Sequence, residues 1–290
     1  MAEIERIVDC RNTLGEGPVW CPIDRVLWWI NITPPELWRF DPVTKVVQSW
    51  PLPKLVGSFA LRRDGGFLIA FRRGFATLDR PGGEVAWVPA PGIDLGETGF
   101  NDGKTDRAGR FWVGAMDRKV TRPIGDLYAI DRELKITQVK ADATVSNGIG
   151  WSPDNRTLYH TDTTTRSIYA YDYDIANGTV ANRRVFVEVE PGHGGPDGMT
   201  VDAHGFVWSA QFDRWCINRY DPAGKLERSV RVPVRRPTSV MFGGADLTTL
   251  YITTARLDQD EAALAEQPWA GSVLAMDAGV KGLAEVRFAE

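Results

Sequence analysis

The chain has 290 residues, and its 34 Lys and Arg against 38 Asp and Glu leave a formal net charge of −4. Acidic and basic residues are interspersed, which excludes a basic block of the kind that binds nucleic acid or an anionic membrane surface. No apolar run approaches the roughly 20 residues of a membrane span, and the polar residues 1–6 do not resemble a signal peptide. We therefore expect a cytoplasmic protein with no nucleic-acid or membrane partner.

Short strands separated by Gly, Pro, Asp and Asn turns are predicted along the whole chain. Residues 3–9 form one predicted strand with no partner nearby in the sequence. Groups of about four strands follow, and they begin near residues 16, 57, 101, 147, 197 and 238. The sixth group is predicted to end in a strand at 285–288. Only residues 259–266 have a helical pattern.

One pattern recurs at the start of four groups: a polar residue close to a glycine, a short strand, a tight turn and a second strand. The last three starts, at 101, 147 and 197, lie 46 and 50 residues apart. A period of about 40–50 residues with four strands per unit is typical of a propeller blade. A β-sandwich would not repeat its phrases in this way, and a β-helix has shorter rungs.

We therefore predict an all-β fold in which residues 1–290 form a single domain. The domain is a six-bladed β-propeller with four antiparallel strands per blade. The strand at 3–9 would close the ring against the last group, because this pairing removes a free sheet edge.

Four polar side chains are predicted to meet at one mouth of the central channel, because the first strand of each blade lines that channel. They are Glu16, Asn101, Asn147 and Asp197. Two carboxylates in a narrow mouth repel one another unless a cation lies between them. Carboxylate and amide oxygens suit Ca²⁺, Mg²⁺ or Mn²⁺. Each Asx-Gly pair alone could be a simple turn, but four at matching repeat positions favour a metal site.

The motifs around these residues resemble a known family over essentially the whole chain. In order they are Gly-Glu-Gly-Pro at 15–18, Phe-Asn-Asp-Gly at 100–103, Ser-Asn-Gly at 146–148, Pro-Asp-Gly at 196–198 and Phe-Gly-Gly at 242–244. The family is that of regucalcin (senescence marker protein), gluconolactonases and bacterial sugar-lactone hydrolases. Its fold is a six-bladed propeller, in agreement with the repeat.

The resemblance also implies roles for the residues at the repeat starts. Glu16, Asn147 and Asp197 would hold one divalent cation, which we expect to be Ca²⁺, with Mg²⁺, Mn²⁺, Zn²⁺ or Fe²⁺ as alternatives. Asp197 would also act as general base, and Asn101 would face the substrate. Asp117, which ends a predicted strand on the same side, is a further candidate for substrate contact.

The predicted function is hydrolysis of a sugar lactone, an aldonolactone of a pentose or hexose, to the aldonic acid by a monomer. The metal would polarise the lactone carbonyl, and Asp197 would take a proton from the attacking water. Three alternatives remain open: a phosphotriesterase, a lactonase for non-sugar lactones, or a calcium-binding propeller without turnover. None of the three histidines (His160, His193 and His204) forms a convincing Ser-His-Asp arrangement.

Two departures from the family pattern concern substrate choice. Regucalcin-like members carry an arginine directly before Phe-Asn-Asp-Gly, where this chain has Gly99. They also carry two acidic residues in the third repeat. At this place the chain has one acid, Asp117, at a shifted position, and Lys119 follows it. We therefore expect the pocket walls to differ although the metal ligands are kept.

Overall fold

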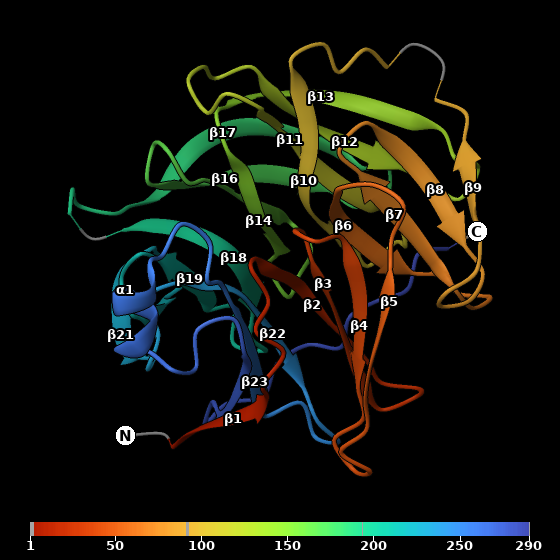
Figure 1. The fold of residues 1–290 in the computed structure, drawn as a ribbon. Coiled ribbons are helices and arrows are strands. Elements are labelled where there is room, and N and C mark those ends of the chain that lie inside the picture. Colours follow the sequence, from red (N-terminus) through yellow and green to blue (C-terminus); the bar gives the residue numbers. More distant parts are fainter. Residues whose placement is uncertain (1–2, 91–92, 193, 290) are drawn as a thin grey trace.

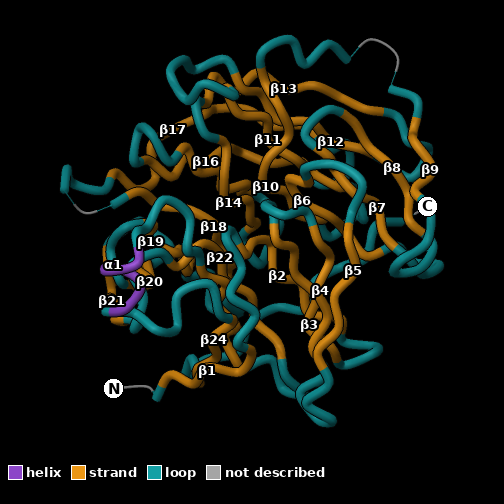
Figure 2. Tube along the Cα trace, viewed as in Figure 1, coloured by secondary structure: helices purple, strands orange, loops and turns teal. Residues whose placement is uncertain are grey.

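The computed structural model describes residues 3–90, 93–192 and 194–289, so that His193 lies outside the described residues. Six four-stranded antiparallel sheets are arranged in a ring, as Figure 1 shows. Strands and the loops between them make up almost all of the described chain (Figure 2). The predicted six-bladed propeller is confirmed. In the described part of the chain no helix has the length and hydropathy of a membrane span.

Each blade begins with an inner strand and proceeds outward in chain order. The first three blades contain β2 (Gly15–Cys21), β3 (Val26–Asn31), β4 (Glu36–Phe40) and β5 (Val47–Pro51); β6 (Val56–Leu61), β7 (Phe67–Phe71), β8 (Gly74–Leu78) and β9 (Val85–Val88); and β10 (Thr98–Thr105), β11 (Phe111–Asp117), β12 (Gly125–Ile130) and β13 (Ile136–Ala143). The last three contain β14 (Ser146–Trp151), β15 (Thr157–Asp162), β16 (Ser167–Asp174) and β17 (Thr179–Glu188); β18 (Gly195–Val201), β19 (Val207–Phe212), β20 (Cys216–Tyr220) and β21 (Leu226–Arg231); and β22 (Pro237–Gly243), β23 (Thr249–Thr254), β24 (Val273–Asp277) and β1 (Ile4–Val8).

The N-terminal strand closes the ring. β1 pairs antiparallel with β24, in a register that places Ile4 opposite Met276. The prediction that residues 3–9 complete the last blade is therefore confirmed. The prediction of an outer strand at 285–288 is wrong, because β1 already occupies that edge of the sheet. The tail instead reaches blade 2, where Phe288 forms an isolated bridge with Arg62.

A short helix lies in the loop between β23 and β24. It spans Glu261–Ala265, within the predicted 259–266. Asp260 caps it, because its carboxylate accepts a hydrogen bond from the backbone N–H of Ala263. The helix has no buried residue, so it lies on the surface of the ring and does not form part of its core.

Apolar side chains hold the blades together. The buried hydrophobic residues form six clusters, and each cluster joins two neighbouring blades. The cluster that joins the last blade to the first contains Val8 of β1 together with Trp20 and Trp29. Burial of apolar surface contributes about 25 cal/mol per Å², so this interface stabilises the closure that the β1–β24 hydrogen bonds begin.

A buried aspartate fixes the turn between the first two strands in two of the blades. In blade 5 the Asp202 carboxylate accepts hydrogen bonds from the indole Nε1 of Trp208 at 3.0 Å and from Arg219 Nη2 at 2.7 Å. In blade 3 Asp106 likewise accepts from Trp112 Nε1 at 3.0 Å. Asp202 is completely buried and Arg219 is 4% exposed, so the two charges depend on one another.

We predict that Asp202→Ala destabilises the fold by about 3–5 kcal/mol, because it leaves the buried Arg219 guanidinium with only the exposed Glu227 as a counter-charge. Urea unfolding followed by tryptophan fluorescence measures the loss. Asp221→Ala is the matched control, since Asp221 caps an outer turn of the same blade through the backbone N–H groups of Ala223 and Lys225. It should cost only about 1 kcal/mol. Equal losses in the two variants would contradict this account.

Candidate functional site

The four residues at the repeat starts lie on the inner strands of four blades. Glu16 is on β2, Asn101 on β10, Asn147 on β14 and Asp197 on β18. Neighbouring inner strands contact one another around the ring, and Figure 1 shows these strands grouped at the centre of the molecule. The carboxylates and amides that the repeat predicted at one mouth therefore do converge.

A bulge turns each inner strand at the same height. The register of the pairing with the second strand shifts at Glu16/Val19, Val56/Ser58, Phe100/Gly103, Asn147/Ile149, Pro196/Met199 and Pro237/Ser239. A bulge leaves an extra residue unpaired and re-aims its side chain. The glycine that follows the polar residue in the repeat thus belongs to the bulge, and the bulge turns the polar side chain out of the sheet.

A chain of hydrogen bonds connects the amides across four blades. Arg72 Nη1 donates to Asn101 Oδ1 at 2.8 Å, and Asn101 Nδ2 donates to Asn147 Oδ1 at 2.8 Å. Asn147 Nδ2 then donates to Thr163 Oγ1 at 2.8 Å, and this hydroxyl donates to the carbonyl of Pro196 at 2.9 Å. The chain ends one residue before Asp197. It assigns the orientation of both amides and leaves Asn147 Oδ1 with one lone pair.

Three carboxylates share the channel. Burial and then the nearby Asp102 raise the pKa of Glu16 to about 8. Burial, followed by the charges of Glu16 and Asp102, raises the pKa of Asp197 well above its usual range. Burial also raises the pKa of Asp102. The charge of Asp102 therefore makes ionisation of Glu16 and Asp197 less favourable, and that of Glu16 does the same to Asp197.

Asp102, which lies between Asn101 and Gly103, acts both on its own turn and on the other carboxylates. Its Oδ1 accepts a hydrogen bond from the backbone N–H of Gly103 at 2.8 Å, as expected of a turn. Its charge nevertheless acts on Glu16 and Asp197. The bulge at 100–103 accounts for this, because two successive residues of a bulged strand can both point toward one face.

The residues present fit a divalent cation with oxygen ligands. Within residues 3–90, 93–192 and 194–289, no three His, Cys, Asp or Glu side chains are grouped as a metal site, but the predicted ligand set includes an asparagine amide. Asp197 is 4% exposed, and its Oδ1 has no hydrogen-bond partner among the described residues. A buried carboxylate oxygen without a partner is costly, and a cation would relieve both this cost and the repulsion from Glu16.

Asp117 is committed to its own turn. It is completely buried, and its Oδ2 accepts from the backbone N–H groups of Thr121 at 3.1 Å and Arg122 at 2.9 Å. Burial alone would raise its pKa, but hydrogen bonds led by the one from Thr121 lower the pKa to about 2. A contact of Asp117 with substrate stays a prediction, and its carboxylate has a structural partner already.

Arg72 was missed by the sequence analysis. It follows β7 in a two-residue loop, and its Nη1 donates to Asn101 Oδ1 and to the carbonyl of Phe100 at 2.9 Å. Burial lowers the pKa of Arg72, and Glu16 opposes that shift. The adjacent pair Arg72-Arg73 after an apolar strand was the available signal, but the repeat pattern assigns no role to this loop.

A serine–histidine pair lies behind the site. Ser146 Oγ and His160 Nε2 are 2.6 Å apart, and both residues are completely buried. Burial lowers the pKa of His160 to about 4, so the ring is neutral. The carbonyl of Ser146 accepts a hydrogen bond from Asn101 Nδ2 at 2.8 Å. The pair therefore supports Asn101 and is not exposed as a nucleophile.

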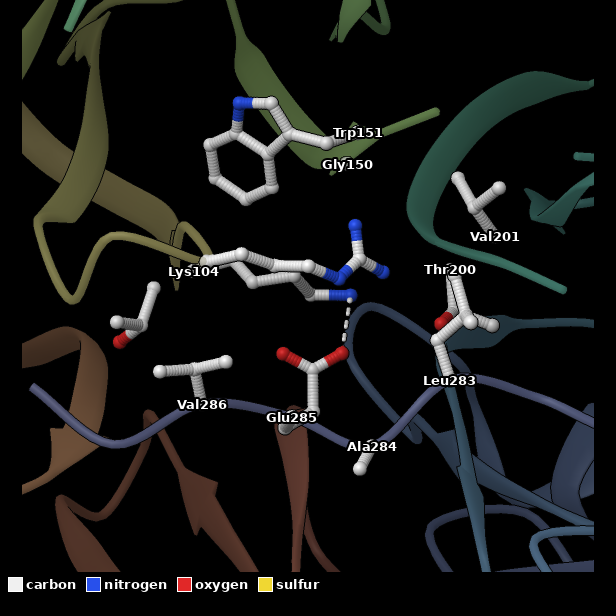
Figure 3. Close-up of a pocket in the computed structure, with 11 residues that line it drawn as sticks. Lys104, Gly150, Trp151, Thr200, Val201, Leu283, Ala284, Glu285 and Val286 are labelled. Carbon is white, nitrogen blue, oxygen red and sulfur yellow. Dashed lines mark ion pairs between the residues drawn. The ribbon is translucent and has the colours of Figure 1, made fainter. Parts of the chain in front are cut away.

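The C-terminal tail covers the opposite end of the channel. Lys104 lies three residues after Asn101 on β10, and its Nζ donates to the carbonyl of Met199 at 2.8 Å and lies 3.7 Å from Glu285 Oε1. Figure 3 shows this ion pair with Trp151 and Val286 beside it. The ends of the inner strands and residues 283–286 of the tail line a small cavity here, which is separate from the mouth where the strands begin.

The fold and the oxygen-lined channel define a six-bladed propeller with a polar ligand site at one mouth. A family model described as SMP-30/Gluconolactonase/LRE-like region matches residues 14–256, and the chain belongs to this family.

Three similar proteins illustrate the range of the family. The chain is 40% identical over 281 residues to 6-deoxy-6-sulfogluconolactonase of Pseudomonas putida, covering 96% of each chain. It is 35% identical over 290 residues to a pentonolactonase of Haloferax volcanii, covering 98% of this chain and 97% of that one. Among solved structures, the calcium-binding protein regucalcin of Agrobacterium tumefaciens has a TM-score of 0.93 and 29% identity, covering 99% of this chain and 97% of that one.

We predict that the metal-free protein loses stability as the pH rises. The folded state holds a proton on Glu16 up to about pH 8, whereas the ordinary pKa is 4.5. The stabilisation that this proton provides is complete below pH 4.5 and is lost as the pH rises through about 8. Melting temperatures of chelator-treated protein across this window test the expectation. Glu16→Gln should flatten the profile, and an unchanged slope in that variant would contradict it.

Proposed function

We propose that this protein is a metal-dependent hydrolase of sugar lactones that converts an aldonolactone of a pentose or hexose to its aldonic acid. The observation that carries the proposal is the convergence of Glu16, Asn147 and Asp197 at one mouth, with an unpartnered carboxylate oxygen on Asp197. The named activities of the sulfogluconolactonase and the pentonolactonase support this reaction type.

Glu16, Asn147 and Asp197 would hold the cation. Ca²⁺ is the expected ion, because all three donors are oxygens, and the calcium-binding regucalcin supports this assignment. A bound divalent ion supplies electrophilic stabilisation of the lactone carbonyl oxygen as negative charge develops there. Asn147 is oriented for this role, since its Nδ2 is already committed to Thr163.

Asp197 is the proposed general base. Its carboxylate takes a proton from water as the water oxygen attacks the lactone carbonyl carbon. The ring C–O bond then breaks, and the same proton passes to the leaving alkoxide oxygen, which yields the hydroxy acid. Met199, two residues further along β18, is buried in the apolar cluster between blades 4 and 5, which holds this strand in place.

Asn101 is the proposed partner of a substrate hydroxyl. Both hydrogens of its Nδ2 are used, by Ser146 O and Asn147 Oδ1. Its Oδ1 accepts one hydrogen bond, from Arg72, and an amide oxygen has a second lone pair. Asn101 can therefore accept a hydrogen bond from a hydroxyl on the sugar, which suits a hydroxylated lactone better than an apolar phosphotriester.

The proposal predicts lactone hydrolysis that requires both the cation and Asp197. Acid release from a panel of pentono- and hexonolactones is followed at constant pH with metal-stripped protein, and again after Ca²⁺, Mg²⁺, Mn²⁺, Zn²⁺ or Fe²⁺ is restored. Activity should return with metal. Asp197→Asn should lower kcat by about 10²–10⁴-fold, the range for removal of a general base.

Asp221→Asn serves as the control, since Asp221 caps an outer turn far from the channel mouth. It should hydrolyse lactones at the wild-type rate. Folded, metal-loaded protein that leaves the whole panel untouched would contradict the proposal. Such a protein would then be tested with phosphotriesters and non-sugar lactones. Calcium binding without turnover of any of these compounds would identify the non-catalytic alternative.

A further inference from the structure

Three arginines close around residues 96–100 at the channel mouth. Arg73 Nη1 donates to the carbonyls of Gly96 at 2.8 Å and Thr98 at 3.0 Å. Arg118 Nε donates to the carbonyl of Glu97 at 3.1 Å. Arg72 Nη1 donates to the carbonyl of Phe100 at 2.9 Å. We call these three residues, Arg72, Arg73 and Arg118, the arginine wall.

The arginine wall forms no ion pair with a carboxylate among the described residues, although the charge of Glu16 acts on Arg72. The hydrogen-bond acceptors of the wall are backbone carbonyls, the amide of Asn101 and the Met116 sulfur. The one carboxylate in the segment, that of Glu97, pairs instead with Lys119 and Arg122. Positive charge thus gathers on one side of the mouth, although the whole chain carries a net charge of −4.

Gly99 allows the arginine wall to form. A Cβ at this position would lie 3.0 Å from the carbonyl oxygen of Arg72, and 3.7 Å from both Arg72 Cβ and Arg118 Cγ. The close approach also lets the backbone N–H of Phe100 donate to the Arg72 carbonyl at 3.2 Å. Because Gly99 has no side chain, the blade 2 loop can pack against it, and this loop carries the guanidinium of Arg72.

Arg72 is the member of the wall that reaches the reacting centre. Its side chain is half-buried, and only Nη1 has partners in the described part of the chain, which leaves Nε and Nη2 for a ligand. One asparagine side chain, that of Asn101, separates it from Asn147. A guanidinium presents its donors as a planar fork that matches the oxygens of sulfonate, phosphate or carboxylate.

We propose that the arginine wall selects sugar lactones that carry an anionic group at the end remote from the lactone carbonyl. Arg72 binds the anion directly through Nε and Nη2, while Arg73 and Arg118 add positive potential at the rim. This inference rests on the proposed lactonase function and names the substrate class of the same site. A neutral hydroxyl would need only one acceptor or donor, whereas three cations that form no ion pair with a carboxylate among the described residues call for an oxyanion.

The test compares matched substrates. The kcat/KM for glucono-δ-lactone is measured beside that for hexonolactones with a sulfonate, a phosphate or a carboxylate at C6. Wild-type protein should prefer at least one anionic lactone by tenfold or more, and the order among the three names the anion. Arg72→Gln should reduce kcat/KM for that substrate at least tenfold more than for the neutral lactone. Added salt should weaken the preference.

Two further variants separate recognition from support of Asn101. Arg118→Gln does not alter a contact of Asn101, so it should lower kcat/KM several-fold for the anionic lactone only. Arg214→Gln is the matched control, since Arg214 follows the second strand of blade 5 as Arg72 follows that of blade 2, and it donates to the carbonyl of Gly192 at 2.7 Å. It should leave the ratio of the two substrates unchanged.

Either of two results would overturn the inference. One is equal kcat/KM for neutral and anionic lactones in the wild-type protein. The other is an equal fold-loss on both substrates in Arg72→Gln, which would make Arg72 a positioning residue for Asn101. Both results leave lactone hydrolysis intact, so they are distinct from failure of the proposed function, in which no lactone is hydrolysed and this inference falls with it.

Discussion

The pairing of β1 with β24 is the interaction on which the rest of the structure depends. It joins the first and the last strand of the chain in one sheet and leaves the ring without an open blade. The candidate site exists only in the closed ring, because Glu16 comes from the first blade while Asn147 and Asp197 come from the fourth and fifth. Val8 adds the apolar contact with Trp20 and Trp29 that holds the first and last blades together. A hydrogen-bonded edge and an apolar interface thus fix the distance between carboxylates that lie far apart in the sequence.

The closed ring imposes an electrostatic conflict at its centre. The inner strands bring Glu16, Asp102 and Asp197 together, and burial raises the pKa of each. Repulsion from the neighbouring carboxylates raises the pKa of Glu16 and Asp197 further. The apolar clusters between blades stabilise the fold strongly enough to hold this unfavourable arrangement. The hydrogen-bond chain from Arg72 to the Pro196 carbonyl keeps the amides from turning away. Binding of a cation would then be favoured, because it relieves the repulsion between these buried carboxylates.

Periodicity explains why most of the fold and the candidate ligands could be predicted from the sequence. A residue that starts an inner strand has the same place in every blade, so the pattern at Asn101, Asn147 and Asp197 carried spatial information. The prediction of an outer strand at 285–288 was wrong, because local sequence does not show which of two segments pairs with a sheet edge. In the structure β1 pairs with that edge. Arg72 was missed for a related reason: it lies in a loop, and its importance depends on the neighbouring blade's strand.

The contrast between inner strands and loops also explains how one ring can serve different substrates. The proposed cation ligands lie at bulges of the inner strands, where a shift would disturb the pairing with the second strand of the blade. Loops between second and third strands have no such constraint and can change the wall of the mouth. At Gly99 the inner strand carries no side chain, and the backbone of the blade 2 loop at Arg72 approaches it closely. In the proposed site a loop residue, Arg72, would therefore hold the remote end of the substrate, whereas the cation ligands stay on the inner strands.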